Sequence, residues 1–230
     1  MNSEDGVIRI ELPFNIDTSA LAKRMRVRGL DRTRKETAAE LVRKASSVAR
    51  PRALYCASTV RHVDDSSVII GGTAFSSRVL SKVLSDQEIA FPYLITIGTE
   101  LDRLDVPSRD MWDRYFLDTV KQMVLQSAGQ AFSDHLHREY RFQRITHMNP
   151  GEIEDWPVTQ QRPLFSIFRK APGEIGVILT GGCMMKPHKS RSGICFANNT
   201  GFETCRLCTQ LRCPGRRAAY DAAAALQYSR

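Results

Sequence analysis

A single long helical pattern in the middle of this chain constrains the fold more than any other feature of the sequence. From about Ser108 to Tyr140, large apolar side chains recur near a period of 3.6 residues, which gathers them on one face of an α-helix. These side chains are Trp112, Tyr115, Phe116, Val120, Met123, Val124, Ala128 and Phe132. We therefore expect this helix to lie at the centre of the core.

Shorter patterns on both sides of this helix predict the other elements. Apolar and β-branched runs indicate strands at 7–12, 53–63, 68–72, 89–98, 175–180 and 192–197. The other helices are expected at 31–49 with Asp31 as N-cap, after Ser76 or Ser77, at 158–170, and from Pro214 to about Leu226. Residues 147–157 and 181–191 contain too much Gly, Pro and polar sequence to be regular.

The length of 230 residues fits one principal domain with extensions at the ends. We expect a basic strand and helix at 1–50, the main domain at 51–200, and a cysteine-rich segment with a final helix at 195–230. No apolar run approaches the roughly 20 residues of a membrane-spanning helix, and the N-terminus lacks a signal-like core. The sequence thus predicts a cytoplasmic protein with no membrane partner.

The net charge of +8 suits an acidic partner, and the basic residues concentrate at 22–52 and 206–217. A solvated helix face explains the first cluster equally well. A nucleic-acid partner is disfavoured, because no aromatic residues are interleaved with the basic ones.

Four of the six cysteines fall within nineteen residues, at Cys195, Cys205, Cys208 and Cys213. In a reducing compartment such clustering indicates a metal site rather than disulfides. Four thiolates can hold an iron–sulfur cluster, either [4Fe–4S] or [2Fe–2S], whereas structural zinc more often uses two Cys-x-x-Cys pairs and only one is present. The sequence favours iron–sulfur, with zinc and then free or oxidised thiols as alternatives. Nearby arginines, among them Arg216 and Arg217, would offset the negative charge of a cluster.

Two further segments carry a family resemblance. Residues 175–198 contain a strand, a Met-x-Pro turn, a Ser-x-Ser-Gly motif at Ser190–Gly193 and a second strand. Upstream lie Pro150-Gly151, then Trp156-Pro157 and a helix beginning near Gln160. In this order, roughly over residues 50–200, the chain resembles the activation (reactivation) domain of vitamin B12-dependent methionine synthase. The resemblance implies an α+β fold with a twisted antiparallel sheet flanked by helices.

The resemblance also implies a function. The activation domain docks on the corrinoid and supplies a methyl group from S-adenosylmethionine, so that inactive cob(II)alamin returns to cob(I)alamin. This chain lacks the Asp-x-His-x-x-Gly loop that ligates cobalt, so the cobalamin would sit on a partner, namely a corrinoid protein or cobalamin-dependent methyltransferase, with ferredoxin or flavodoxin as electron donor. No catalytic residue is assigned. The implied cofactor-binding residues are His147, Pro150, Gly151, Glu152, Met184, Met185, Ser190, Ser192 and Gly193.

Two of these positions depart from the family pattern. His147 and Glu152 stand where the family has an arginine and a tyrosine that help to hold S-adenosylmethionine. A neutral imidazole does not replace the grip of an arginine on a carboxylate. The sequence therefore predicts weak binding of S-adenosylmethionine, and electron delivery from the cysteine cluster as the other route. The alternative function is a non-enzymatic scaffold, stabilised by zinc, that binds a corrinoid protein.

Overall fold

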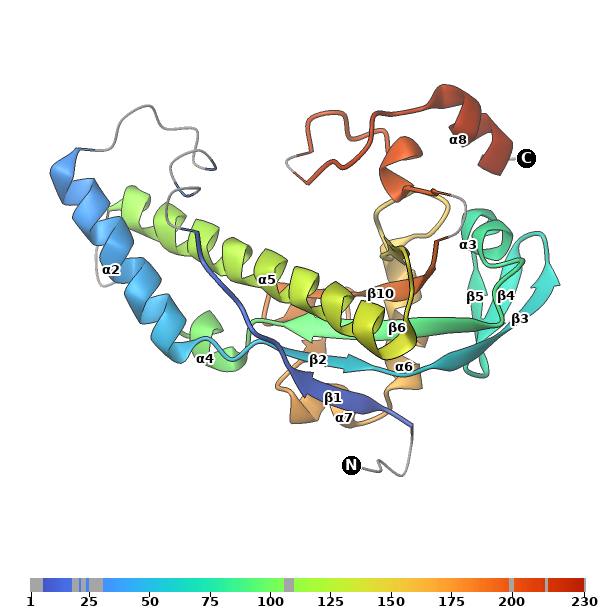
Figure 1. Ribbon diagram of the computed structural model, residues 1–230, viewed down its shortest axis with the longest axis horizontal. Coiled ribbons are helices and arrows are strands. Elements are labelled where there is room, and N and C mark those ends of the chain that lie inside the picture. The colour runs from blue at the N-terminus through green and yellow to red at the C-terminus, as the bar shows by residue number, and fades with distance from the viewer. Residues whose placement is uncertain are drawn as a thin grey trace.

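The computed structural model describes residues 6–17, 21, 24, 31–105, 110–198, 201–213 and 215–229. Within them, an eight-stranded antiparallel sheet is flanked by helices (Figure 1). Its strands are β1 (Ile8–Glu11), β2 (Arg52–Tyr55), β3 (Ser58–Asp64), β4 (Ser67–Ile70), β5 (Thr73–Ser76), β6 (Ile89–Thr96), β7 (Ile145–Met148) and β10 (Ser190–Ala197). A separate hairpin pairs β8 (Ile178–Leu179) with β9 (Met185–Lys186). The α+β class and the curled antiparallel sheet expected from the resemblance are confirmed.

The helices are α2 (Arg32–Val48), α3 (Arg78–Val83), α4 (Thr99–Asp102), α5 (Met111–Tyr140), α6 (Gln161–Ile167), α7 (Ala171–Glu174) and α8 (Ala222–Ser229). Two 3₁₀ turns accompany them, η1 (Val158–Gln160) and η2 (Thr204–Arg206). None of the helices in these described ranges is both long enough and apolar enough to cross a membrane.

Strand β6 is the centre of the sheet. One of its edges pairs with β2 and then with β3, and the other edge pairs with β10, which in turn pairs with β7. Seven of its eight residues are buried. A strand that is covered on both faces needs apolar side chains on both, which explains its uninterrupted apolar sequence.

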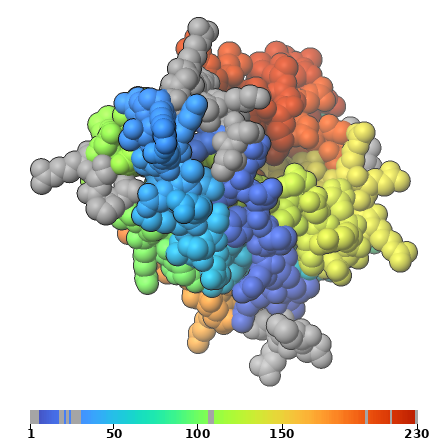
Figure 2. All heavy atoms as spheres, turned by 60° about the vertical axis from the view of Figure 1, so that its left-hand side comes forward, coloured from blue at the N-terminus to red at the C-terminus, as the bar shows by residue number. Residues whose placement is uncertain are grey.

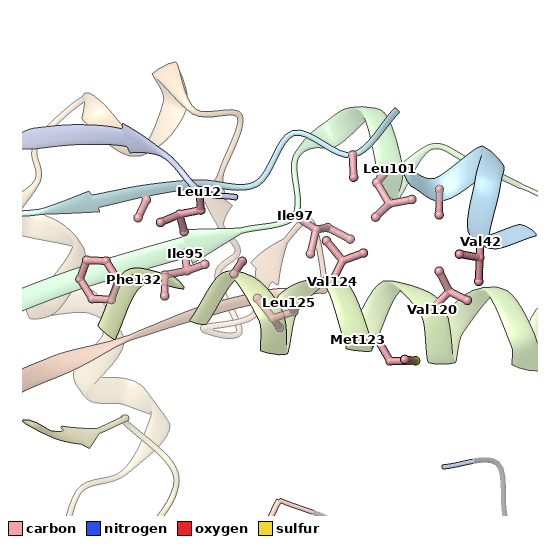
Figure 3. Close-up of a cluster of buried hydrophobic side chains, with 14 of the residues drawn as sticks. Leu12, Val42, Ile95, Ile97, Leu101, Val120, Met123, Val124, Leu125 and Phe132 are labelled. Atoms are coloured by element: carbon pink, nitrogen blue, oxygen red, sulfur yellow. The ribbon is translucent and has the colours of Figure 1, made fainter. Parts of the chain in front are cut away.

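Helix α5 covers one face of this sheet, as its apolar pattern predicts. The Asp110 carboxylate caps it by accepting a hydrogen bond from Trp112 N at 2.9 Å. Its buried side chains include Val124 and Phe132, which lie toward Ile97 and Ile95 of the sheet side in Figure 3. Val120 is also buried and lies toward Val42 of α2 in the same view. The expected start at Ser108 lies outside the described residues.

The described part of the first fifty residues belongs to the same core. Strand β1 extends the sheet beside β2, and α2 packs along α5. Asp31 caps α2 as expected, accepting from Arg34 N at 2.8 Å. Figure 2 shows the segment after β1 crossing this face between α2 and the C-terminal part of α5, where Asn15 N donates to Ser127 Oγ at 2.8 Å. Lys23, Arg26 and Arg28 of the basic cluster lie outside the described residues.

The opposite face of the sheet carries a second core. Trp156, Phe75 and Phe168 are at most 1% exposed there, together with apolar residues of α3 and α6. In Figure 1, α6 and α7 lie on the far side of the sheet from α5. Trp156 therefore anchors the loop 147–157 in this second core.

Three expected elements differ from the structure, and β5, β7, β9, α4 and α7 are not among those expected. The run 53–63 is two strands separated at Cys56–Ala57, and the strand at 175–180 is reduced to Ile178–Leu179. The last helix starts at Ala222 rather than at Pro214, which itself lies outside the described residues. The segment before α8 is instead folded around the side chain of Arg216, a contact that no local pattern predicts.

Candidate functional site

The loop 147–157 is fixed by contacts to both cores. Gly151 has a φ of 91°, which favours glycine, and its N–H donates to Trp156 O at 2.7 Å. The Trp156 side chain is fully buried. Asp155 accepts hydrogen bonds from the Ser77 hydroxyl and from Val79 N, so the loop caps the start of α3. Pro150 is buried and Glu152 is exposed.

The Ser-x-Ser-Gly motif holds strands and loop together. Ser192 Oγ donates to Gln161 Oε1 at 3.2 Å, and Ser190 Oγ donates to Pro187 O at 2.8 Å. A Cβ on Gly193 would lie 2.3 Å from Met148 O, so only glycine fits beside β7. Within the described residues these three positions thus make structural contacts, and their predicted contact with a cofactor stays a prediction.

The β8–β9 hairpin presents Met184 to solvent. Met184 is 59% exposed and Ile178 is 57% exposed, whereas Met185 packs against the second core. The turn is held from below by Arg162, whose Nη2 donates to Gly181 O at 2.6 Å and whose Nε donates to Cys183 Sγ at 3.4 Å. The turn predicted to face a cofactor therefore exposes apolar side chains, and Arg162 fixes its backbone.

A polar cavity of about 280 Å³ lies between α5, the β6–β10–β7 part of the sheet and the segment after β10. Its lining residues are Tyr93, Ile95, Gln126, Gly129, Gln130, Ser133, His137, Ile145, Thr146, His147, Arg191, Glu203 and Arg217. Of the predicted cofactor-binding residues, His147 lines this cavity, and the others lie outside its lining.

His147 is uncharged in this site. Its Nε2 lies 2.9 Å from Ser133 Oγ, and its ring stands edge-on to Tyr93 at 5.3 Å between centroids. Burial, followed by the guanidinium groups of Arg191 and Arg217, lowers the pKa of His147 to about 3. The buried Nδ1 has no hydrogen-bond partner among the described residues. The neutral imidazole assumed for weak binding of S-adenosylmethionine is therefore the form present at neutral pH.

The structure does not bring the four clustered cysteines together. Cys195 is fully buried under α5, its Sγ donates to Phe91 O at 3.4 Å, and burial raises the pKa of this thiol well above its usual value. Cys205 and Cys208 are half-buried and Cys213 is exposed, all three on the segment after β10. Nowhere in the described ranges do three or more His, Cys, Asp or Glu side chains gather closely enough to hold a metal ion. The expected four-thiolate set, for iron–sulfur or for zinc, does not fit this arrangement.

The arginines of this segment serve other contacts than a metal cluster. The Arg216 guanidinium donates to the carbonyls of Cys205 at 2.7 Å, Cys208 at 2.8 Å and Gln210 at 2.8 Å, and so fixes the cysteine loop. Arg217 Nε pairs with Glu203 Oε2 at 3.1 Å, and Arg217 also lines the cavity.

Sequence reasoning missed Arg191 and Arg217 as site residues. Arg191 occupies the unspecified position of the Ser-x-Ser-Gly motif. Because side chains alternate along a strand, Arg191 lies on the opposite face from Ser190 and Ser192. This alternation would have identified Arg191 as a residue facing α5. No comparable signal exists for Arg217, which reaches the cavity through the fold of an irregular segment.

No protein-family model matches this chain, and no curated protein matches it. Among solved structures, the chain is similar to the MetH reactivation domain, in a crystal structure of that domain bound to AdoHcy. The TM-score is 0.61 and the sequence identity is 14%, over 86% of this chain and 80% of that chain. At this identity the similarity establishes the architecture: the chain has the fold of the MetH reactivation domain.

Proposed function

We propose that this chain supports the return of cob(II)alamin to cob(I)alamin on a separate cobalamin-dependent methyltransferase or corrinoid protein. The similarity in fold to the MetH reactivation domain over 86% of the chain carries this proposal. That span takes in most of the chain, beyond the residues 50–200 of the motif resemblance. The chain would act as an accessory that docks on the corrinoid held by its partner.

The hairpin at Met184 is the proposed docking surface. Met184 and Ile178 form an exposed apolar pair on it, and the exposed Lys186 adds a positive charge that suits an acidic partner or the phosphate-bearing tail of the corrinoid. Lys189 does not add to this charge, because its Nζ pairs with Asp118 at 3.0 Å.

The electron is assigned to a separate donor such as a ferredoxin or flavodoxin, because the cysteines do not form a four-thiolate set in this fold. A corrinoid held by the partner would supply the nucleophilic cobalt. This chain's own residues fix the loop 147–157, through the hydrogen bonds of Asp155 to Ser77 and Val79 and the buried Trp156. Weak binding of S-adenosylmethionine stays a prediction. It is checked by calorimetry on the unmodified protein and on the His147→Arg, Glu152→Tyr double variant, which is expected to bind more tightly.

The scaffold function is the second candidate. It is favoured by one observation, that the Ser-x-Ser-Gly residues expected to face a cofactor are taken up by structural contacts. In this case the chain would bind a corrinoid protein without promoting reduction.

The test mixes the protein with a cob(II)alamin-loaded corrinoid protein encoded beside its gene, plus reduced flavodoxin, without oxygen. Loss of the cob(II)alamin absorption, or formation of methylcobalamin when a methyl donor is present, is the expected result. Met184→Asp should weaken association about tenfold or more, whereas Met111→Asp, an 81% exposed methionine at the start of α5, should not. Binding without reduction would support the scaffold, and absence of binding would overturn both functions.

A further inference from the structure

The accessible cysteines of this chain lie together on the segment after β10, which runs as a loop toward α8 in Figure 1. Cys205 and Cys208 are half-buried there, and Cys213 is exposed. The buried cysteines are Cys56, Cys183 and Cys195. Because a thiol reacts only where another molecule can reach it, thiol chemistry with an external ligand falls to this segment.

Cys205 and Cys208 are separated by one helical turn. Arg206 ends the 3₁₀ turn η2, and Leu207 follows it with a φ of −96° and a ψ of −15°, so both intervening residues have a helical backbone. Such a turn brings the Cα atoms of its first and fourth residues to less than about 7 Å of each other. A disulfide spans roughly 4.4–6.8 Å between Cα atoms. The turn therefore places the two cysteines within reach of one disulfide bond.

The Arg216 guanidinium fixes this turn from inside the loop. Its Nη1 donates to Cys205 O at 2.7 Å, and its Nη2 donates to Cys208 O at 2.8 Å. The same two nitrogens also donate to Ala218 O at 3.0 Å and to Gln210 O at 2.8 Å. A single planar and rigid group thus holds the backbone of both cysteines at a fixed spacing, and these contacts use neither thiol.

The side chains of the three accessible cysteines have different surroundings. Cys205 Sγ accepts a hydrogen bond from Arg217 N at 3.4 Å, which orients its side chain. Cys208 packs against the second core. Cys213 does not complete a set with them, because in the parts of the chain that the structure describes no three potential metal ligands gather closely. The geometry thus singles out a pair of thiols.

We propose that Cys205 and Cys208 form a redox-active dithiol, a site of thiol–disulfide exchange whose ligand is a low-molecular-weight disulfide. The Cys205 thiolate attacks one sulfur of the ligand, which breaks the ligand disulfide, forms a mixed disulfide and releases one thiol. The Cys208 thiolate then attacks Cys205 Sγ, closes the Cys205–Cys208 disulfide and releases the second thiol. Two electrons pass from the cysteines to the ligand sulfurs, and the two thiol protons end on the released thiols. The site needs no corrinoid, so it goes beyond the proposed reactivation function and does not depend on it.

The first experiment treats the reduced full chain with glutathione disulfide in the absence of oxygen and maps the products by mass spectrometry. Trypsin cleaves after Arg206 and Arg212, so each accessible cysteine falls in a different peptide. A disulfide between Cys205 and Cys208 that dithiothreitol reverses is the expected product.

Two variants test the order of the steps. Cys208→Ser should stop at the glutathione adduct of Cys205, because the second attack is missing. Cys213→Ser is the matched control and should still form the Cys205–Cys208 disulfide. A disulfide that includes Cys213, or an adduct that persists in the unmodified protein, would overturn the proposal.

The second experiment tests the role of Arg216. Arg216→Ala removes the contacts to both cysteine carbonyls, so the glutathione adduct should persist about tenfold longer before the disulfide closes. Arg212→Ala, at an exposed position of the same segment, should leave this rate unchanged. An equal rate in Arg216→Ala contradicts the proposed pair. Iron or zinc in the anaerobically purified protein that is lost in Cys205→Ser would assign the thiols to a metal and also overturn it.

Discussion

Strand β10 and the segment that follows it are neighbours in sequence, yet they are held in opposite ways. In β10, backbone pairing to β6 and β7 sets the position of each residue, and five of its eight residues are buried. In the described parts of this segment, 201–213 and 215–221, the one helical element is the 3₁₀ turn η2, and side-chain hydrogen bonds from Arg216 and Arg217 hold the segment in place. A sequence motif in a paired strand therefore indicates how its residues pack, whereas a motif in an irregular segment indicates little about which of its residues come together.

The largest expected effect tests the packing of β10. Gly193→Ala places a Cβ 2.3 Å from Met148 O, and backbone cannot give way there cheaply. The free energy of unfolding should fall by about 3 kcal/mol or more, measured by urea denaturation. Gly181→Ala, where no atom lies within 4 Å of the added Cβ, is the control and should change stability by less than about 0.5 kcal/mol. Similar values for both variants would remove the packing explanation of the motif.

The next effect tests the segment after β10. Arg216→Ala removes hydrogen bonds to four carbonyls, so residues 205–213 and 215–218 should lose their fixed arrangement at a cost of about 2 kcal/mol. Hydrogen exchange in this segment should become about tenfold faster, while exchange in β10 should not change. Arg212→Ala, at an exposed position, is the control. Loss of protection throughout the sheet would mean that the two regions fold as one unit.

The third prediction concerns the cavity that both regions line. The pKa of His147 is lowered to about 3, so the unfolded chain binds a proton that the folded chain does not between roughly pH 6.5 and 3. The stabilising contribution is complete above this window and is lost as the pH falls through it. Between pH 7 and pH 5 the unmodified protein should lose about 1–2 kcal/mol more than His147→Gln. A slope unchanged in His147→Gln would show that His147 is accessible to protons.

The smallest effect concerns Cys195. Its thiol is buried in the core by strand β10, whereas the sequence pattern predicts that it joins the cysteines of the following segment in a metal site. The structure places its thiol in the apolar core beneath α5, so Cys195→Ser should lower stability by about 1 kcal/mol and leave the metal content unchanged. Iron, zinc and acid-labile sulfide are measured on anaerobically purified protein, with Cys205→Ser for comparison. A loss of metal in Cys195→Ser would restore the four-thiolate prediction and show that the core opens to admit the metal.

Much of the fold was accessible from periodicity alone. The 3.6-residue pattern correctly predicted helix α5, and the apolar run correctly predicted strand β6, because each pattern follows directly from which side chains are buried. Asp31 was correctly predicted to cap α2, because capping depends only on residues close in sequence. The late start of α8 was not accessible, since the Arg216 contacts replace the turn of helix expected after Pro214.

For the candidate site, the sequence by itself identified His147 and the loop that carries it, because the order of short motifs is a property of the chain. The residues that surround His147 follow from the three-dimensional fold and not from its neighbours in sequence. Arg191 enters the cavity because strand alternation and the small Gly129 direct it there, and Arg217 arrives across a long loop closure. The same structure separated Cys195 from the other cysteines, because register places residue 195 opposite Phe91 and His147 in the core, and spacing along the chain carries no information about such a pairing.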